Sequence, residues 1–203
     1  MSQESPLYED TEKRYVEVVQ WHVVKEKILT RLRENDSGIC TLYLGNCNFR
    51  GEECKLLCEA LRVNSTVTKI NLYCNGIGAE ECKYLSELLR VNSTIATVLL
   101  HNNKIGAEGC KYLSEALRVN STITSINIDE NSIGDEGCKY LSESLRVNST
   151  ITSVNLGGNN IGDEGCKYLS ESFRVNNKLT GLNLSNNQIT TFPMDWIFSN
   201  TTL

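Results

Sequence analysis

The feature that most constrains this chain is a 28-residue segment that recurs along most of its length. Residues 95–122, IATVLLHNNKIGAEGCKYLSEALRVNST, are followed directly by ITSINIDENSIGDEGCKYLSESLRVNST. Two residue types mark the same period, at Cys54, Cys82, Cys110, Cys138 and Cys166, and at Asn64, Asn92, Asn120, Asn148 and Asn176. A fixed period in this range predicts a stacked solenoid, because a single unit cannot bury its own apolar face.

Each unit has the pattern of a short strand, a turn and a helix. The strand pattern begins at Ile39, Val67, Ile95, Ile123, Ile151 and Leu179. Apolar residues two apart would face one side of the strand, and a glycine would then open the turn. In the unit that begins at Ile95, the helical spacing of Cys110, Leu113 and Leu117 predicts one buried helix face. The pattern therefore predicts an α/β fold.

The motifs of the unit also resemble a known class of repeat. The N-x-I-G segment at Asn103, Ile105 and Gly106 and the helix that ends in L-R-V-N, residues 117–120, are similar to the ribonuclease-inhibitor-like leucine-rich repeat. They also resemble the repeats of NOD-like receptors and of Ran GTPase-activating protein. The resemblance implies a curved horseshoe segment with parallel β-strands on the concave face and α-helices on the convex face. A fold of this kind leaves the function open.

The period divides the chain into three parts. Residues 1–38 are predicted to form an N-terminal cap that is mainly helical, because apolar residues lie at helical spacing at Trp21, Val24, Ile28 and Leu32. The β-branched residues before about residue 22 leave a strand there as the alternative. Residues 39–178 form five repeats. Residues 179–203 form an atypical repeat that we expect to close the core with Phe192, Trp196 and Phe198.

The composition narrows the class of ligand. The formal net charge is −5 and the pI is about 5.2, without the basic stripe that nucleic acid requires, so we expect no nucleic-acid partner. No apolar run reaches 18 residues, and the first 15 residues are too polar and acidic for a secretory signal. We therefore expect no membrane partner, a cytoplasmic location and a monomer.

The cysteines, histidines and asparagines have structural interpretations. Nine cysteines, an odd number at regular spacing, predict free buried thiols. The closest pair, Cys54 and Cys58, has no second pair in register, so no metal site is predicted. His22 and His101 are far apart and no nucleophile motif is present, so we predict no enzyme and no cofactor. The N-x-S/T triplets at Asn64, Asn92, Asn120 and Asn148 would end helices through a left-handed conformation.

The exposed strand positions vary between units. The residue between the two strand leucines is in turn Tyr43, Asn71, Leu99, Asn127, Asn155 and Asn183. The next exposed column reads Gly45, Tyr73, His101, Asp129, Gly157 and Ser185, and the following one reads Asn46, Cys74, Asn102, Glu130, Gly158 and Asn186. Positions that are the same in every unit are needed for stacking. The residues in these three columns differ between units, so stacking does not constrain them.

This variation predicts a site on the concave face. Aromatic and apolar residues gather toward its N-terminal half and are followed by an acidic step, at Tyr43, Tyr73, Leu99, His101, Asp129 and Glu130. Aromatic anchors beside charges favour a protein partner, and neutral drift of an unused surface is the alternative. We therefore predict a protein–protein interaction module. A regulator of a small GTPase built on the same scaffold is the alternative function.

Overall fold

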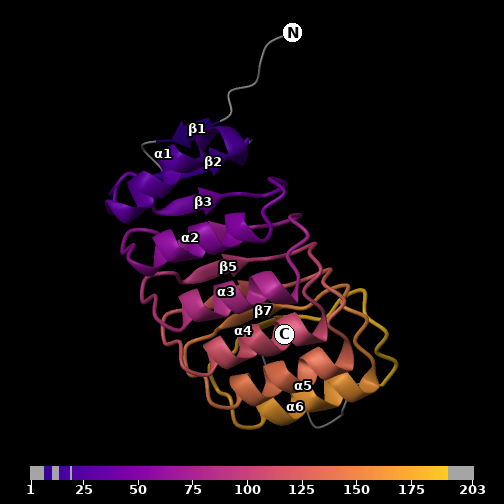
Figure 1. The fold of residues 1–203 in the computed structure, drawn as a ribbon. Helices are drawn as coiled ribbons and strands as arrows, with labels where there is room; N and C mark the ends of the chain where they lie inside the picture. The colour runs from indigo at the N-terminus through magenta and orange to yellow at the C-terminus, as the bar shows by residue number, and fades with distance from the viewer. Residues whose placement is uncertain (1–6, 11–13, 19, 192–203) are drawn as a thin grey trace.

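The computed structural model describes residues 7–10, 14–18 and 20–191, which form one sheet of eight strands covered on one side by helices (Figure 1). The strands are β1 Leu7–Asp10, β2 Tyr15–Val18, β3 Thr41–Tyr43, β4 Lys69–Asn71, β5 Thr97–Leu99, β6 Ser125–Asn127, β7 Ser153–Asn155 and β8 Gly181–Asn183. Their order in the sheet is the order of the sequence. Strands β1 and β2 are antiparallel, and every later pair is parallel.

The helices alternate with the strands. They are α1 Trp21–Arg33, α2 Glu52–Arg62, α3 Ala79–Leu89, α4 Gly106–Leu117, α5 Gly134–Leu145 and α6 Asp163–Phe173. Neighbouring strands lie about 4.8 Å apart, whereas packed helices need about 8–10 Å. The sheet therefore forms the inner, concave layer and the helices the outer layer. This arrangement confirms the predicted α/β leucine-rich repeat solenoid.

The core runs without a break between the two layers. Strand residues such as Leu42, Ile70 and Val98 are fully buried against helix residues such as Leu57 and Leu85. The predicted cysteine ladder is confirmed as part of this core, because Cys54, Cys82, Cys110, Cys138 and Cys166 are all buried. A small side chain suits this position because it faces the next helix, as where Cys110 Sγ lies 3.4 Å from Gly137 O of α5.

The asparagines at the ends of the helices differ from the prediction. Positive φ angles occur elsewhere in the units and not at Asn64, Asn92, Asn120, Asn148 or Asn176, so the expected left-handed conformation is wrong. Asn120 instead is buried, and its Oδ1 accepts hydrogen bonds from the backbone N–H groups of Thr122 and Ile123. Its Nδ2 donates to Leu89 O at 2.7 Å in the preceding unit. The hydrogen bonds of this buried amide therefore link each unit to the preceding one.

A second asparagine ladder lies on the opposite edge, where strands lead into helices. Its members are Asn75, Asn103, Asn131, Asn159 and Asn187. Asn103 Oδ1 accepts from the N–H groups of Asn75 and Ile77 at 2.9 and 3.0 Å, and its Nδ2 donates to Leu72 O at 3.0 Å. Each side chain therefore satisfies backbone groups of the preceding unit that would otherwise be buried without partners.

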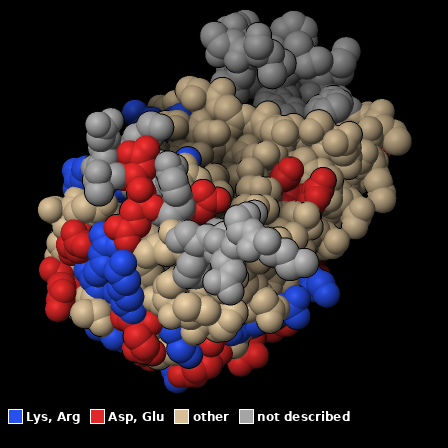
Figure 2. Space-filling model, turned by 90° about the horizontal axis from the view of Figure 1, so that it is seen from above, with Lys and Arg blue, Asp and Glu red and all other residues tan. Residues whose placement is uncertain are grey.

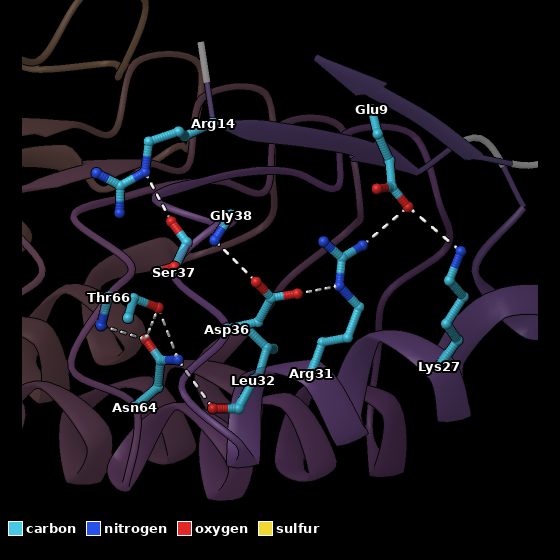
Figure 3. Close-up of polar contacts among 10 residues, drawn as sticks. All are labelled: Glu9, Arg14, Lys27, Arg31, Leu32, Asp36, Ser37, Gly38, Asn64 and Thr66. Carbon is cyan, nitrogen blue, oxygen red and sulfur yellow. Dashed lines mark hydrogen bonds and ion pairs between the residues drawn. The ribbon is translucent and has the colours of Figure 1, made fainter. Parts of the chain in front are cut away.

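The N-terminal region adds two strands and one helix to the array. Residues 7–18 contain an antiparallel strand pair, so the strand alternative holds before residue 19, and the helix begins at Trp21. Figure 3 shows polar contacts within this region and between it and the first unit. Arg31 pairs with Glu9 at 2.8 Å and with Asp36 at 2.6 Å, and Asn64 Nδ2 donates to Leu32 O at 2.8 Å.

The last strand, β8, ends at Asn183, and an irregular segment follows it as far as residue 191. The aromatic residues that we expected to close the core, Phe192, Trp196 and Phe198, lie outside the described residues. Within the described part of the chain, no helix is long and apolar enough to cross a membrane.

Candidate functional site

The sheet register aligns the variable residues of neighbouring units. Tyr43, Asn71 and Leu99 are direct partners across β3, β4 and β5, and Asn127 follows on β6. The later residues of each unit lie beyond the strand ends. Tyr73, His101, Asp129 and Glu130 follow β4, β5 and β6 in the loops that lead to the helices. The prediction that all six residues lie on strands is therefore correct only for Tyr43 and Leu99, because each strand has only three residues before the chain turns.

The side chains of Tyr73 and His101 form the centre of the candidate site. Their rings are stacked, with centroids 5.1 Å apart and planes 5° from parallel. Gly45 makes room for this arrangement, since a Cβ atom at that position would overlap the Tyr73 ring. Tyr73 keeps 38% of its surface exposed. A glycine and two rings in successive units therefore give a flat aromatic surface, of which Tyr73 is exposed and His101 is half-buried.

Two further residues extend this surface along the strands. The Tyr43 ring lies under the Lys69 ammonium, with Nζ 5.7 Å from the ring centroid. This distance is within the range of a cation–π interaction. Leu99 is half-buried on β5, between the aligned Asn71 and Asn127. The apolar part of the site thus spans the first three units of the repeat array.

Two enclosed polar atoms lie where the aromatic surface meets the acidic step. His101 Nδ1 and Asp129 Oδ1 are both shielded from solvent, and neither has a hydrogen-bond partner among the described residues. A shielded polar atom without a partner costs about 1–3 kcal/mol. Because both atoms are shielded, a group from another molecule would remove that cost only after the His101 or Asp129 side chain turned outward.

The backbone at Glu130 carries strain. This residue and its equivalents adopt positive φ angles, at Asn46, Cys74, Asn102, Glu130, Gly158 and Asn186. Asparagine and glycine tolerate this conformation, whereas Cys74 at 52° and Glu130 at 52° pay a steric penalty of about 1 kcal/mol each. Strained residues of this kind gather at functional sites. Both exceptions lie beside the Tyr73–His101 stack, at positions directly after Tyr73 and Asp129.

Replacing Glu130 with asparagine should therefore stabilise the protein. We expect the free energy of unfolding to rise by about 0.5–1 kcal/mol and Tm by about 2–3 °C, because asparagine is the residue that other units use in this conformation. Glu130→Gln is the matched control, since it removes the charge and keeps the strain, and it should leave Tm unchanged. An equal gain in both variants, measured by calorimetry, would show that charge and not backbone conformation limits stability here.

A polar hollow of about 320 Å³ lies next to the stack and was missed by the comparison of strand columns. Arg50 and Lys104 line it together with Cys74, Gly76 and five asparagines. A comparison of equivalent loop positions between units would have revealed it. Arg50 stands where the next four units have glycine, and Lys104 stands where other units have Asn48, Gly76, Ser132 and Asn160.

The charged side chains elsewhere gather on the helical side. Lysines and glutamates of α4 and α5, such as Lys111, Glu115 and Lys139, are exposed there. Figure 2 shows side chains of both signs crowded along the lower and left-hand rim of that view. This mixture of opposite charges is typical of a solvated surface. It contrasts with the hollow, whose two charged lining residues are both cations.

The thiols are not organised as a reactive centre. Burial raises the pKa of the Cys110 thiol to about 12, and burial with the Glu17 charge raises the pKa of Cys47 to about 11. Both thiols are therefore protonated at neutral pH, although a thiolate is the form that reacts or binds metal. Among the described residues, no three His, Cys, Asp or Glu side chains form a group that could hold a metal ion.

A stacked unit of strand, loop and helix, joined by asparagine ladders, defines the class of leucine-rich repeat solenoids. The sequence agrees, because models described as Leucine Rich repeat match residues 119–142 and 147–170, and a Leucine Rich Repeat model matches residues 178–200. The chain therefore contains leucine-rich repeats. No curated protein matches it significantly in sequence.

Solved structures show the same fold at low sequence identity. The tropomodulin C-terminal domain from Caenorhabditis elegans superposes with a TM-score of 0.62 at 20% identity, over 72% of this chain and 89% of that one. Leiomodin-1 actin-binding site 2 superposes with a TM-score of 0.59 at 17% identity, over 87% of this chain and 84% of that one. The leucine-rich repeat-containing protein LegL7 from Legionella pneumophila superposes with a TM-score of 0.58 at 17% identity, over 82% of this chain and 53% of LegL7.

Proposed function

We propose that this chain is a protein-interaction module that binds a protein partner through its concave face and the adjoining strand-to-helix loops. The contact residues would be Tyr43, Tyr73, Leu99, His101, Asp129 and Glu130. The units would be of the ribonuclease-inhibitor-like type, and the protein would act as a monomer in the cytoplasm. The observation that carries the proposal is the stack of the exposed Tyr73 ring on the half-buried His101 ring, which ends at His101 Nδ1 and Asp129 Oδ1, two atoms without a hydrogen-bond partner among the described residues.

The composition of this surface favours a binding role over neutral drift. Aromatic side chains are enriched at the energetic centres of protein interfaces, because they bury much area with few rotatable bonds. A surface released to drift would not be expected to keep strained residues at both Cys74 and Glu130, since asparagine is less strained there. Binding of a partner that packs on the rings and donates a hydrogen bond to Asp129 would offset the free-energy cost of the strained backbone and of the unpartnered oxygen.

The test is capture of the partner by wild-type protein and by Tyr73→Ala/His101→Ala. We expect the double variant to weaken binding by about 2 kcal/mol or more, which is about 30-fold, because both rings lie at the centre of the site. Tyr168→Ala, on the helical side, is the matched control and should bind as wild type. Circular dichroism should show that all three proteins unfold within a few degrees of one another.

The outcome also separates the candidate partners. Actin is the first defined partner to test, since one structural neighbour is described as an actin-binding site of leiomodin-1. If the captured protein is a small GTPase, its rate of GTP hydrolysis is measured with this protein added at a lower concentration than the GTPase. A faster rate would establish the alternative function, a GTPase regulator. Capture that is equally strong with Tyr73→Ala/His101→Ala would remove this face as the binding surface.

A further inference from the structure

The hollow beside the stack has the charge and shape of a site for an oxyanion. It lies in the loops that follow β3, β4 and β5, at the carboxyl ends of parallel strands. Among the residues that line it, Arg50 and Lys104 are charged and none is acidic, although the whole chain carries a net charge of −5. The local field therefore favours an anion.

Arg50 is held in place before any ligand arrives. Its Nε donates to Asn75 O at 2.9 Å, and its guanidinium lies so close to Gly76 that a Cβ atom there would overlap it. The φ angle of Gly76 is +68°, a conformation that itself favours glycine. A fixed guanidinium loses little conformational entropy when it binds, and its fork of N–H groups matches a carboxylate or a phosphate.

A neighbouring carboxylate, Glu81, interacts electrostatically with Arg50, but both of its oxygens accept hydrogen bonds from the backbone. Glu81 Oε1 accepts from Gly51 N at 2.8 Å, and Oε2 accepts from Gly78 N at 2.9 Å. Burial opposes its ionisation, but hydrogen bonds from the backbone N–H groups of Gly51, Gly78 and Glu81 itself, together with the Arg50 charge, outweigh burial and lower the pKa of Glu81. Glu81 is thus an anion committed to the backbone. Within the described part of the chain, neither Arg50 nor Lys104 forms an ion pair.

Two independent departures from the repeat meet at this one place. Arg50 and Lys104 are 54 residues apart, in different units, and each replaces a small or neutral residue of the template. Stacking does not need either change, because the other units fold without a cation at these positions. The lysines and arginines of the template lie on the helical side instead, as at Lys139 and Arg146.

We infer that the hollow between Arg50 and Lys104 binds an oxyanion, a carboxylate or phosphate on a peptide segment of the protein partner. Its volume of about 320 Å³ is at the small end of ligand sites and suits a side chain rather than a large cofactor. Cys74 and Asn102, which line it, directly follow Tyr73 and His101. The inference rests on the proposed function, since one peptide would cross the stack and place its acidic group here.

The site can be tested without the partner. Acetyl-phosphoserine N-methylamide and acetyl-glutamate N-methylamide are titrated separately into the whole protein at constant ionic strength, and amide signals are followed by NMR. We expect saturable shifts at Gly76, Asn102 and Lys104 with at least one probe. In Arg50→Gln/Lys104→Gln the affinity should fall at least tenfold. Lys139→Gln/Arg146→Gln, which removes the same charge from α5 and from the residue that follows it, should retain wild-type affinity.

The outcomes decide both the site and the source of the anion. Saturation by the phosphoserine probe alone supports a phosphorylated partner, and saturation by the glutamate probe supports an acidic one. Shifts that fail to saturate with either probe, or an unchanged affinity in Arg50→Gln/Lys104→Gln, would overturn the inference. Because Tyr73→Ala/His101→Ala leaves Arg50 and Lys104 in place, anion binding should survive in it, so the proposed function and this site can fail separately.

Discussion

Replacing Phe49 with alanine should lower the free energy of unfolding by about 4 kcal/mol. Phe49 is fully buried at the junction between α1 and the first repeat. Its ring meets the Trp21 ring edge to face, with centroids 4.7 Å apart and an angle of 66° between planes. Truncation would remove this aromatic contact and leave a cavity that rigid neighbours cannot close.

The measurement is urea unfolding followed by circular dichroism, with Trp21 fluorescence as the local reading in a Trp196→Phe background, since the chain has two tryptophans. Trp21 Nε1 donates to Glu53 at 2.6 Å, so loss of docking should expose the indole and shift its emission to longer wavelength. Phe49→Leu is the graded control and should cost about 1–1.5 kcal/mol. A loss below 1 kcal/mol in Phe49→Ala would mean that α1 contributes little to the array, and residues 1–38 would then not act as a cap.

Much of the fold follows from periodicity because the same contacts recur in every unit. The 28-residue spacing fixes which residues become neighbours, since Tyr43, Asn71 and Leu99 can align only if each unit adds one strand in register. The cysteine ladder follows from the same period together with the chemistry of the residue, because a small apolar side chain that every unit keeps on a helix is expected to face the core. The lysine that every unit keeps directly after it, as at Lys111 and Lys139, is exposed.

Asn120 shows where this reasoning stops. Periodicity reveals that the residue is fixed, but its physical role depends on whether its side chain is buried. A local rule for helix ends suggested a left-handed backbone, whereas the structure uses the amide to bridge Leu89 O and the N–H groups of its own unit. The bridge joins groups 31 residues apart, so no local pattern contains it.

The candidate site is harder to predict because it consists of departures from the period. The sequence identified Tyr73 and His101 as neighbours, but the stack also requires the empty space at Gly45 in the preceding unit. Glu130 looked like an ordinary strand residue until its φ angle of 52° placed it in a turn. Arg50 and Lys104 were missed because they lie in loops, where no apolar pattern draws attention to a column.

Replacing Asn159 with alanine should lower the free energy of unfolding by about 3 kcal/mol and Tm by about 10 °C. This side chain is fully buried in the ladder on the strand-to-helix edge. Its Oδ1 accepts from Asn131 N at 3.0 Å, and its Nδ2 donates to Ile128 O at 2.9 Å and Gly157 O at 3.0 Å. Alanine would remove this partner from Asn131 N, Ile133 N and Ile128 O in the interior, whereas Gly157 O keeps its hydrogen bond from Glu130 N at 2.8 Å.

The matched control is Asn177→Ala, since Asn177 is exposed and the change of side chain is the same. It should change stability by less than about 0.5 kcal/mol. Solenoid units are stabilised by their neighbours, so hydrogen exchange in Asn159→Ala should accelerate first in α6 and β8, which depend on this interface, and later in α2 and α3. Uniform acceleration over all units would show that the array unfolds as one body. Equal stability of both variants would mean that the ladder is not what joins the units.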